Sequence, residues 1–136
     1  MRVKSISRSR IHFTKEHEWI DFNGTVGFVG LSAFKLLNIK NISKLTWHYN
    51  KGTIEMGSLI AKVYSEDEII SVHAPVSCKF LGVNQKLTNN LNLVIQSPQD
   101  QGWLFFITPT KLNEKECLMV PGDYYASNHL KACEQV

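Results

Sequence analysis

Short runs of alternating apolar and polar residues, separated by turn residues, occupy most of the chain. This pattern predicts a mainly β fold, because strand side chains alternate between faces with a period of two. The clearest hairpin joins Glu18–Phe22 to Thr25–Val29 through Asn23-Gly24, a dipeptide that strongly favours a tight β-turn. Further strands are expected at Ile11–Phe13, Ile39–Trp47, Lys79–Val83, Leu91–Ile95 and Gln101–Ile107, the last being the most apolar and therefore central.

A second hairpin is predicted between Gly57 and Pro75. When this segment is folded about Glu66 and Asp67, three pairs share one face, namely Val63 with Ile70, Ala61 with Val72, and Leu59 with Ala74. The turn is then Ser65-Glu66-Asp67-Glu68, whose three consecutive carboxylates belong in water. The hairpin is therefore expected to present an acidic tip at one end of the molecule.

Helices are expected only at the periphery of this β-rich domain. Ser32–Leu37 can form a brief helix with Ser32 as its N-cap, and Lys111–Met119 is helix-like. After Pro121-Gly122, Asp123 can cap a last helix whose Ala126, Leu130 and Cys133 fall on one face. No linker interrupts the chain, so residues 11–136 are expected to form a single domain behind a basic tail at residues 1–10.

Composition narrows the classes of function. The chain has 136 residues, 43% of them hydrophobic, and a net charge of +3. Four of the basic residues lie in the tail, which resembles a short mitochondrial presequence or an unstructured solubilising arm. The remainder is close to neutral, which gives no indication of nucleic-acid binding. With no secretory segment and no apolar run of about 20 residues, an intracellular protein without membrane contact is expected.

Metal and catalytic motifs are not evident in the sequence. Cys78, Cys117 and Cys133 are odd in number and widely spaced, which argues against a disulfide framework or a zinc ribbon. No nucleophile motif is present, so no enzymatic activity is expected. The acidic tip has three interpretations: a solvated turn, a docking determinant for a basic partner surface, or a metal site. The last is disfavoured because adjacent carboxylates on a tight turn diverge.

Several segments together resemble the lipoyl-carrying H-protein of the glycine cleavage system. The family's N-terminal signature is similar to Phe13–Trp19, which reads FTKEHEW, and its GTVG strand is similar to Gly24–Gly27. Its APVS and GWL motifs match Ala74–Ser77 and Gly102–Leu104, and its VNEAL segment resembles Val83-Asn84 with Leu87. The resemblance runs from about Ile11 to the C-terminal helix. It implies a flattened β-barrel or barrel-sandwich hybrid of the lipoyl/biotinyl-carrier type, and makes Glu16-His17-Glu18 a structural segment at the start of a strand.

The resemblance also identifies a missing functional group. Counted back without gaps from Ala74–Ser77, the family's lipoylated segment E-S-V-K-A falls on Tyr64–Glu68, so that Asp67 occupies the position of the modified lysine. Cys78 likewise replaces the family's glycine after APVS. Lipoate is attached as an amide to a primary amine, which a carboxylate cannot replace. The nearest amine is Lys62, which lies within the predicted strand rather than at the tip.

These residues lead to an expectation of an H-protein-like protein without lipoate or any other cofactor. It would act as a scaffold or regulator that docks on glycine cleavage or lipoate-handling enzymes. The resemblance implies glycine decarboxylase, aminomethyltransferase, dihydrolipoyl dehydrogenase and lipoyl ligase as candidate partners, in the cytoplasm or in the mitochondria of a eukaryote. Two alternatives stay open: a working carrier modified at another residue, and a decayed copy with no remaining role.

Overall fold

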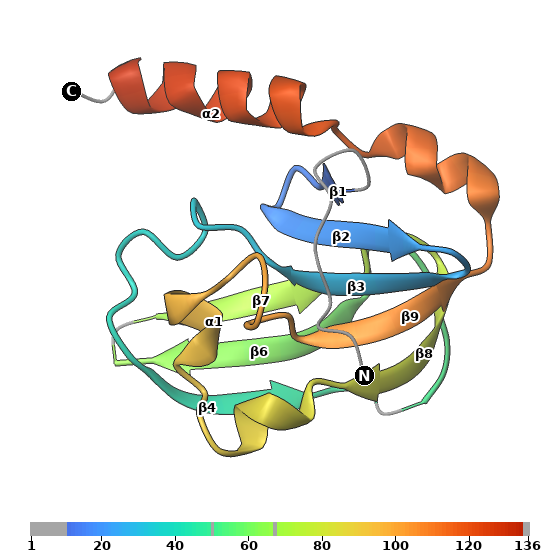
Figure 1. The fold of residues 1–136 in the computed structure, drawn as a ribbon, viewed down its shortest axis with the longest axis horizontal. Helices are drawn as coiled ribbons and strands as arrows, with labels where there is room; N and C mark the ends of the chain where they lie inside the picture. Colours follow the sequence, from blue (N-terminus) through green and yellow to red (C-terminus); the bar gives the residue numbers. More distant parts are fainter. Residues whose placement is uncertain (1–10, 50, 67, 135–136) are drawn as a thin grey trace.

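Two β-sheets pack against each other, with helices at the edges and one end (Figure 1). The computed structural model describes residues 11–49, 51–66 and 68–134. One sheet has six strands in the order β1-β2-β3-β9-β8-β5, and the other has three in the order β4-β6-β7. The strands are β1 (Ile11–Phe13), β2 (Glu18–Asn23), β3 (Val26–Leu31), β4 (Ile42–Trp47), β5 (Gly52–Ile54), β6 (Leu59–Ser65), β7 (Ile69–His73), β8 (Cys78–Val83) and β9 (Phe105–Pro109). The helices are η1 (Gln85–Thr88), α1 (Leu93–Gln96), η2 (Leu112–Cys117) and α2 (Pro121–Glu134).

The mainly β fold predicted from the sequence is confirmed. Strand β9 lies inside the six-stranded sheet between β3 and β8, so the most apolar segment is an interior strand as expected. The main core draws on strands of both sheets and includes Ile20, Val29, Ile60, Val63 and Phe105. Burial of these side chains is the principal force that holds the two sheets together.

Both predicted hairpins form. In the β2–β3 hairpin Gly24 has a φ of 66°, a left-handed conformation that glycine adopts without steric cost. In the β6–β7 hairpin Val63 pairs with Ile70 and Ala61 with Val72, as predicted. The expected pairing of Leu59 with Ala74 is wrong, because Leu59 pairs with His73 across a register shift between Leu59 and Ala61. This irregularity turns Ile60 into the core together with Ala61.

Two local predictions are corrected by the structure, and a third is confirmed. The segment 32–37 forms hydrogen-bonded turns rather than a helix, because the Ser32 hydroxyl is bonded to Tyr124 instead of capping the following backbone. Residues 91–95 are not a strand; the last three of them belong to α1 (Leu93–Gln96), which buries Val94. The helix-like character predicted for 111–119 is confirmed, since Leu112–Cys117 form the 3₁₀ helix η2.

The C-terminal helix is confirmed, although it begins at Pro121 and the part of it whose side chains are described packs through Tyr124 rather than Ala126. Ala126 is exposed, and the side chains of Leu130 and Cys133 lie outside the described part of the structure. Instead Tyr124 is fully buried and stacks on Phe13, with ring centroids 3.9 Å apart. With Ile11 and Trp19 these two residues form a second, smaller core that attaches α2 to the six-stranded sheet (Figure 1).

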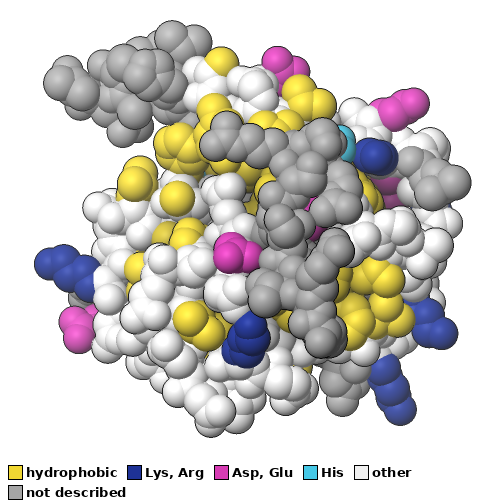
Figure 2. Space-filling view, in the orientation of Figure 1, with side chains coloured by type: hydrophobic (Ala, Val, Ile, Leu, Met, Phe, Trp, Pro, Cys, Tyr) yellow, Lys and Arg dark blue, Asp and Glu magenta, His cyan; other side chains and the backbone are white. Residues whose placement is uncertain are grey.

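The basic tail at residues 1–10 lies outside the described residues. On the face shown in Figure 2, the described Lys and Arg side chains are scattered singly rather than gathered in one basic patch. In the described part of the chain, no helix combines the length and the apolarity that crossing a membrane requires.

Candidate functional site

The turn between β6 and β7 is closed by hydrogen bonds between Ser65 and Glu68. The Ser65 backbone N–H donates to the Glu68 carbonyl over 2.9 Å, and the Ser65 hydroxyl donates to the same carbonyl over 3.2 Å. The Glu68 N–H donates back to the Ser65 hydroxyl oxygen over 3.2 Å. Glu66 and Glu68 are exposed, while Asp67 itself lies outside the described residues. The hydroxyl thus ties together the two residues that flank the acidic tip.

The segment that precedes β4 lies beside this turn. Asn38, Ile39, Lys40 and Asn41 share a hollow of about 250 Å³ with Ser65, Glu66 and Glu68. The Asn92 side chain holds the segment in place by accepting from the Ile42 N–H over 2.9 Å and donating to Asn41 Oδ1 over 2.8 Å. Lys40, exposed at this hollow, is therefore an amine near the tip. The sequence contains no signal for this proximity, because strand pairing predicts which strands are neighbours and does not predict where a connecting segment such as 38–41 lies.

Lys62, the nearest amine in the sequence, lies within β6. It is paired with Thr46 of β4 and with Ser71 of β7, and its side chain is half-buried. Strand β6 is the central strand of its sheet, with a neighbour on each side. Lys62 is therefore placed along the sheet rather than at the turn.

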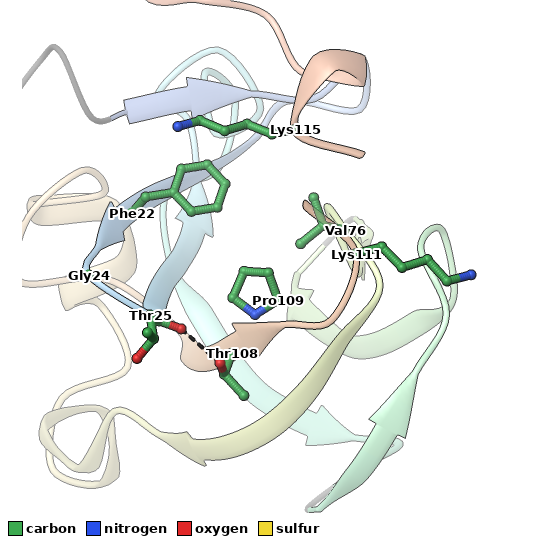
Figure 3. Close-up of a pocket in the computed structure, with 8 residues that line it drawn as sticks. All are labelled: Phe22, Gly24, Thr25, Val76, Thr108, Pro109, Lys111 and Lys115. Atoms are coloured by element: carbon green, nitrogen blue, oxygen red, sulfur yellow. Dashed lines mark hydrogen bonds between the residues drawn. The ribbon is translucent and has the colours of Figure 1, made fainter. Parts of the chain in front are cut away.

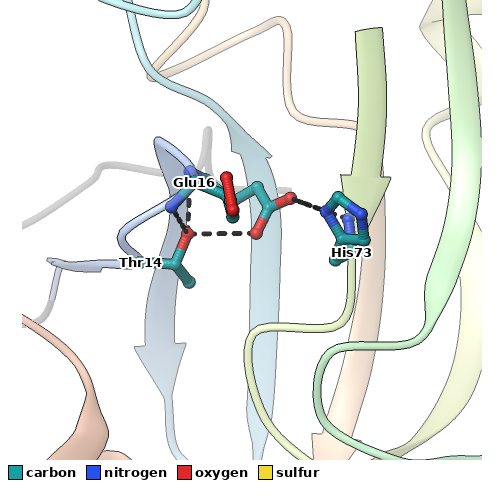
Figure 4. A network of polar contacts seen from close by, with 4 residues as sticks. Thr14, Glu16 and His73 are labelled. Carbon is teal, nitrogen blue, oxygen red and sulfur yellow. Dashed lines mark hydrogen bonds and ion pairs between the residues drawn. The ribbon is translucent and has the colours of Figure 1, made fainter.

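A second group of polar side chains surrounds the carboxylate of Glu18, which is only 1% exposed. Thr14 Oγ1 donates to Glu18 Oε1 over 3.0 Å, while Glu18 Oε2 accepts from the His73 backbone N–H over 2.7 Å. The ring of His73 also reaches Glu18 Oε2, with Nδ1 at 3.0 Å (Figure 4). The contacts connect the start of β2 to the end of β7, and thereby join the two sheets.

The local sequence explains how the loop before β2 presents Glu18. Thr14 Oγ1 accepts from the N–H groups of Glu16 and Glu18 over 3.2 and 3.1 Å, and His17 adopts a positive φ of 67°. This tight loop turns the Glu18 side chain inward. Burial raises the pKa of Glu18 above its ordinary value, and the hydrogen bonds from His73 oppose that shift.

A hollow of about 320 Å³ lies beside this pair, bounded by the Thr14–Glu18 loop, Met56, His73, Pro75 and Cys117. Sequence reasoning treated Glu18 as structural, and the role in joining the sheets agrees with that interpretation. The partnership with His73 had no signal in the sequence, because the two residues are 55 positions apart.

Metal-ligating side chains and cysteine thiols are the other candidate chemical groups in the described part of the chain. Among the described His, Cys, Asp and Glu residues, no group of three or more is placed to hold a metal ion. Cys78 is a buried free thiol and Cys117 an exposed one. Burial, with a smaller contribution from the charge of Glu114, raises the pKa of Cys78 to about 12, so this thiol is a poor nucleophile at neutral pH.

A two-sheet β domain that displays a tight hairpin turn at one end is the architecture of a lipoyl-type carrier domain. A solved structure of similar fold is the glycine cleavage system H protein of Mycobacterium marinum, with a TM-score of 0.77 and 22% sequence identity. The match covers 89% of this chain and 98% of that one.

Sequence comparison leads to the same family. A family profile described as "Glycine cleavage H-protein" matches residues 11–130. The chain is 29% identical to the "Putative glycine cleavage system H protein, mitochondrial" of Schizosaccharomyces pombe, over 83% of this chain and 67% of that protein. It is 27% identical to the "Probable glycine cleavage system H protein" of Aeropyrum pernix, over 92% of this chain and 87% of that protein. The chain belongs to the glycine cleavage H-protein family.

Proposed function

We propose that this protein is an H-protein-like member of its family that carries no lipoate at the hairpin and serves as a non-catalytic docking or regulatory protein. The observation that carries the proposal is Asp67, which stands where the family's motif has its modified lysine. The flanking segments align without gaps from Gly57 to the APVS motif, so no shift of the hairpin restores an amine. Acyl transfer to a carboxylate would not give the stable amide on which lipoyl carriage depends.

The partners proposed are the enzymes that handle the family's lipoyl group: glycine decarboxylase, aminomethyltransferase, dihydrolipoyl dehydrogenase and lipoyl ligase. The hairpin turn is closed by hydrogen bonds between Ser65 and Glu68, on either side of its centre. Glu66 and Glu68 are exposed there and give it negative charge. A partner with a basic surface is complementary to such a tip, and complementary charge increases both the rate and the selectivity of association. The compartment would be that of these enzymes, the cytoplasm or the mitochondrion.

A working carrier modified at another residue is the competing proposal, and Lys40 is its best-placed acceptor. Lys40 is exposed and shares a hollow with Glu66 and Glu68, whereas Lys62 is half-buried in a central strand. Enzymes that recognise a hairpin tip would find Lys40 beside the tip and Lys62 away from it.

Intact-mass analysis of the full chain, expressed in cells that lipoylate a family member in parallel, distinguishes the two proposals. We expect the unmodified mass. A lipoyl adduct, located at Lys40, Lys62 or elsewhere by peptide mapping, would refute the non-carrier function.

Docking is tested separately by affinity capture with each of the four purified enzymes. We expect at least one to bind, and a Glu66→Gln, Glu68→Gln double variant to bind more weakly, because it removes two charges from the tip. Glu116→Gln is the matched control, since Glu116 is an exposed carboxylate on η2, outside the hairpin. If none of the four enzymes binds the wild-type chain, the docking role is wrong and the interpretation as a decayed copy gains support.

A further inference from the structure

A hollow at the end of the molecule opposite the β6–β7 turn has no role in the function proposed above. Its volume is about 280 Å³. Phe22 and Thr25 contribute from the β2–β3 hairpin, Val76 from the segment before β8, and Pro109 from the end of β9 (Figures 1 and 3). Lys111 and Lys115 complete its rim. Several strand ends therefore meet at this hollow.

The walls of the hollow are largely apolar. In Figure 3 the ring of Phe22, the side chain of Val76 and the ring of Pro109 border the same space. Val76 is 1% exposed, so that wall is continuous with the main core. A short hydrocarbon group would transfer apolar surface from water by entering this space, which is favourable by roughly 25 cal/mol per Å².

Two lysine side chains line the rim, and in Figure 3 their ammonium groups point in opposite directions, that of Lys115 over Phe22 and that of Lys111 away from the hollow. Among the described residues that line the hollow, the charged ones are Lys111 and Lys115, and there is no carboxylate. Lys115 Nζ lies 4.8 Å from the centre of the Phe22 ring. Its flexible stem allows the ammonium group to approach a ligand at the mouth.

The two nearby acidic residues leave these charges available. Glu114 lies between the lysines in sequence, but its carboxylate accepts from the Ser77 N–H over 2.6 Å and from the Ser77 hydroxyl over 2.9 Å. Glu55 Oε2 is 3.7 Å from Lys111 Nζ, and both side chains are more than half exposed. Such exposed pairs are weak, so Lys111 can exchange Glu55 for another anion.

We propose that this hollow binds a small organic anion, a short apolar chain that ends in a carboxylate. The chain would lie against Phe22, Val76 and Pro109, and the carboxylate would lie at the rim, where Lys115 is near Phe22 and the exposed Lys111 side chain can turn from Glu55 toward it. The volume is just below the usual range of about 300–1,000 Å³ for drug-sized ligands, which favours a small molecule over a peptide segment. This site is independent of the hairpin tip and of the enzymes proposed to bind there.

The test is an NMR titration of the full-length protein with hexanoate at neutral pH, with hexylamine as a ligand of the same chain length and opposite charge. Hexanoate should give saturable shifts at the amides of Thr25, Val76 and Thr108. The affinity for hexylamine should be lower by a factor of about ten or more. Absence of saturable shifts at these amides, or equal binding of hexylamine, would overturn the proposal.

Charge-removing variants test the role of the rim. Lys111→Gln and Lys115→Gln keep most of the stem, and each should weaken hexanoate binding about threefold, as expected for one exposed ionic contact. Lys51→Gln is the matched control, because Lys51 is exposed and does not line the hollow. Unchanged affinity in the Lys111→Gln, Lys115→Gln double variant, with amide dispersion preserved, would also overturn the proposal.

Discussion

Glu18 and His73 join the two β-sheets through a buried carboxylate that accepts hydrogen bonds from the backbone N–H and the ring of one histidine, at 2.7 and 3.0 Å. Burial raises the pKa of Glu18 above its ordinary value of 4.5, so the folded state binds its proton more tightly than the unfolded state. The resulting contribution to stability is present below pH 4.5 and is lost as the pH rises through the raised pKa of the folded state.

The Glu18→Gln variant cannot titrate at this position, so it does not lose this contribution to stability as the pH rises. We expect its free energy of unfolding to increase relative to that of the wild type as the pH rises from about 4 to about 8, so that the variant becomes comparatively more stable. Urea unfolding at a series of pH values measures the difference, with Glu16→Gln as the exposed control. A difference that moves in the opposite direction would mean that the hydrogen bonds from His73 outweigh the cost of burial.

Tyr124 should stabilise the attachment of α2 by its hydroxyl as well as by its ring. The hydroxyl lies 2.7 Å from His17 Nδ1 and 2.6 Å from Ser32 Oγ, while the ring stacks on Phe13. Tyr124→Phe keeps the stacking and leaves these partners without the hydroxyl, which should lower the free energy of unfolding by about 1–3 kcal/mol. Chemical denaturation gives the value.

Tyr125→Phe is the control for this change, because Tyr125 is 39% exposed and its hydroxyl accepts an exposed hydrogen bond from the half-buried Gln99. Its effect should stay within about 0.5 kcal/mol. Equal effects of the two substitutions would contradict a special role for the Tyr124 hydroxyl.

Gly30 is required by the close approach of Trp19. A Cβ atom at position 30 would lie 2.7–2.8 Å from the Trp19 indole, whose ring is fully buried and bonded through Nε1 to the carbonyls of Leu31 and Pro98. Gly30→Ala should therefore destabilise the protein by about 1–3 kcal/mol, measured by thermal or urea unfolding. Gly122→Ala, at a position in α2 with open space around it, should be neutral or slightly stabilising.

The two described free thiols should differ sharply in reactivity. In a Cys133→Ser background at about pH 8, a chromogenic disulfide reagent should titrate the exposed Cys117 in the native state. Cys78, buried and with its pKa raised to about 12, should react only after denaturation. Peptide mapping identifies the modified residue, and rapid native labelling of Cys78 would show that the end of β8 opens readily.

Restoring one lysine should not restore lipoylation. Asp67→Lys alone is expected to be poorly modified in lipoylation-competent cells, because Tyr64, Glu66 and Glu68 also depart from the family's segment. The comparison variant adds Tyr64→Glu, Glu66→Val and Glu68→Ala, and should be modified more completely by intact mass. Efficient modification of Asp67→Lys alone would show that the rest of the recognition surface is intact.

The pairing of neighbouring strands was predictable where the alternation of apolar and polar residues and the turn-forming residues indicated the same hairpin. Asn23-Gly24 specified one hairpin, and the apolar pattern placed Val63 opposite Ile70 and Ala61 opposite Val72. The pattern failed at Leu59, because an irregularity in the ladder has no distinctive residue signal. It also failed at residues 91–95, where a short apolar run is compatible with either strand or helix.

The sequence by itself determined the family, and its motifs predict that Asp67 stands at the position of the family's lipoyl-lysine, since both inferences need only the identity and spacing of residues along the chain. Tertiary structure alone decided which distant side chains meet: Glu18 with His73, and Tyr124 with His17 and Ser32. It also brought Lys40 to the same hollow as Glu66 and Glu68. The reason is physical. Strand periodicity specifies which face a side chain takes, whereas contacts between sheets and between loops depend on how whole elements pack to bury their apolar faces.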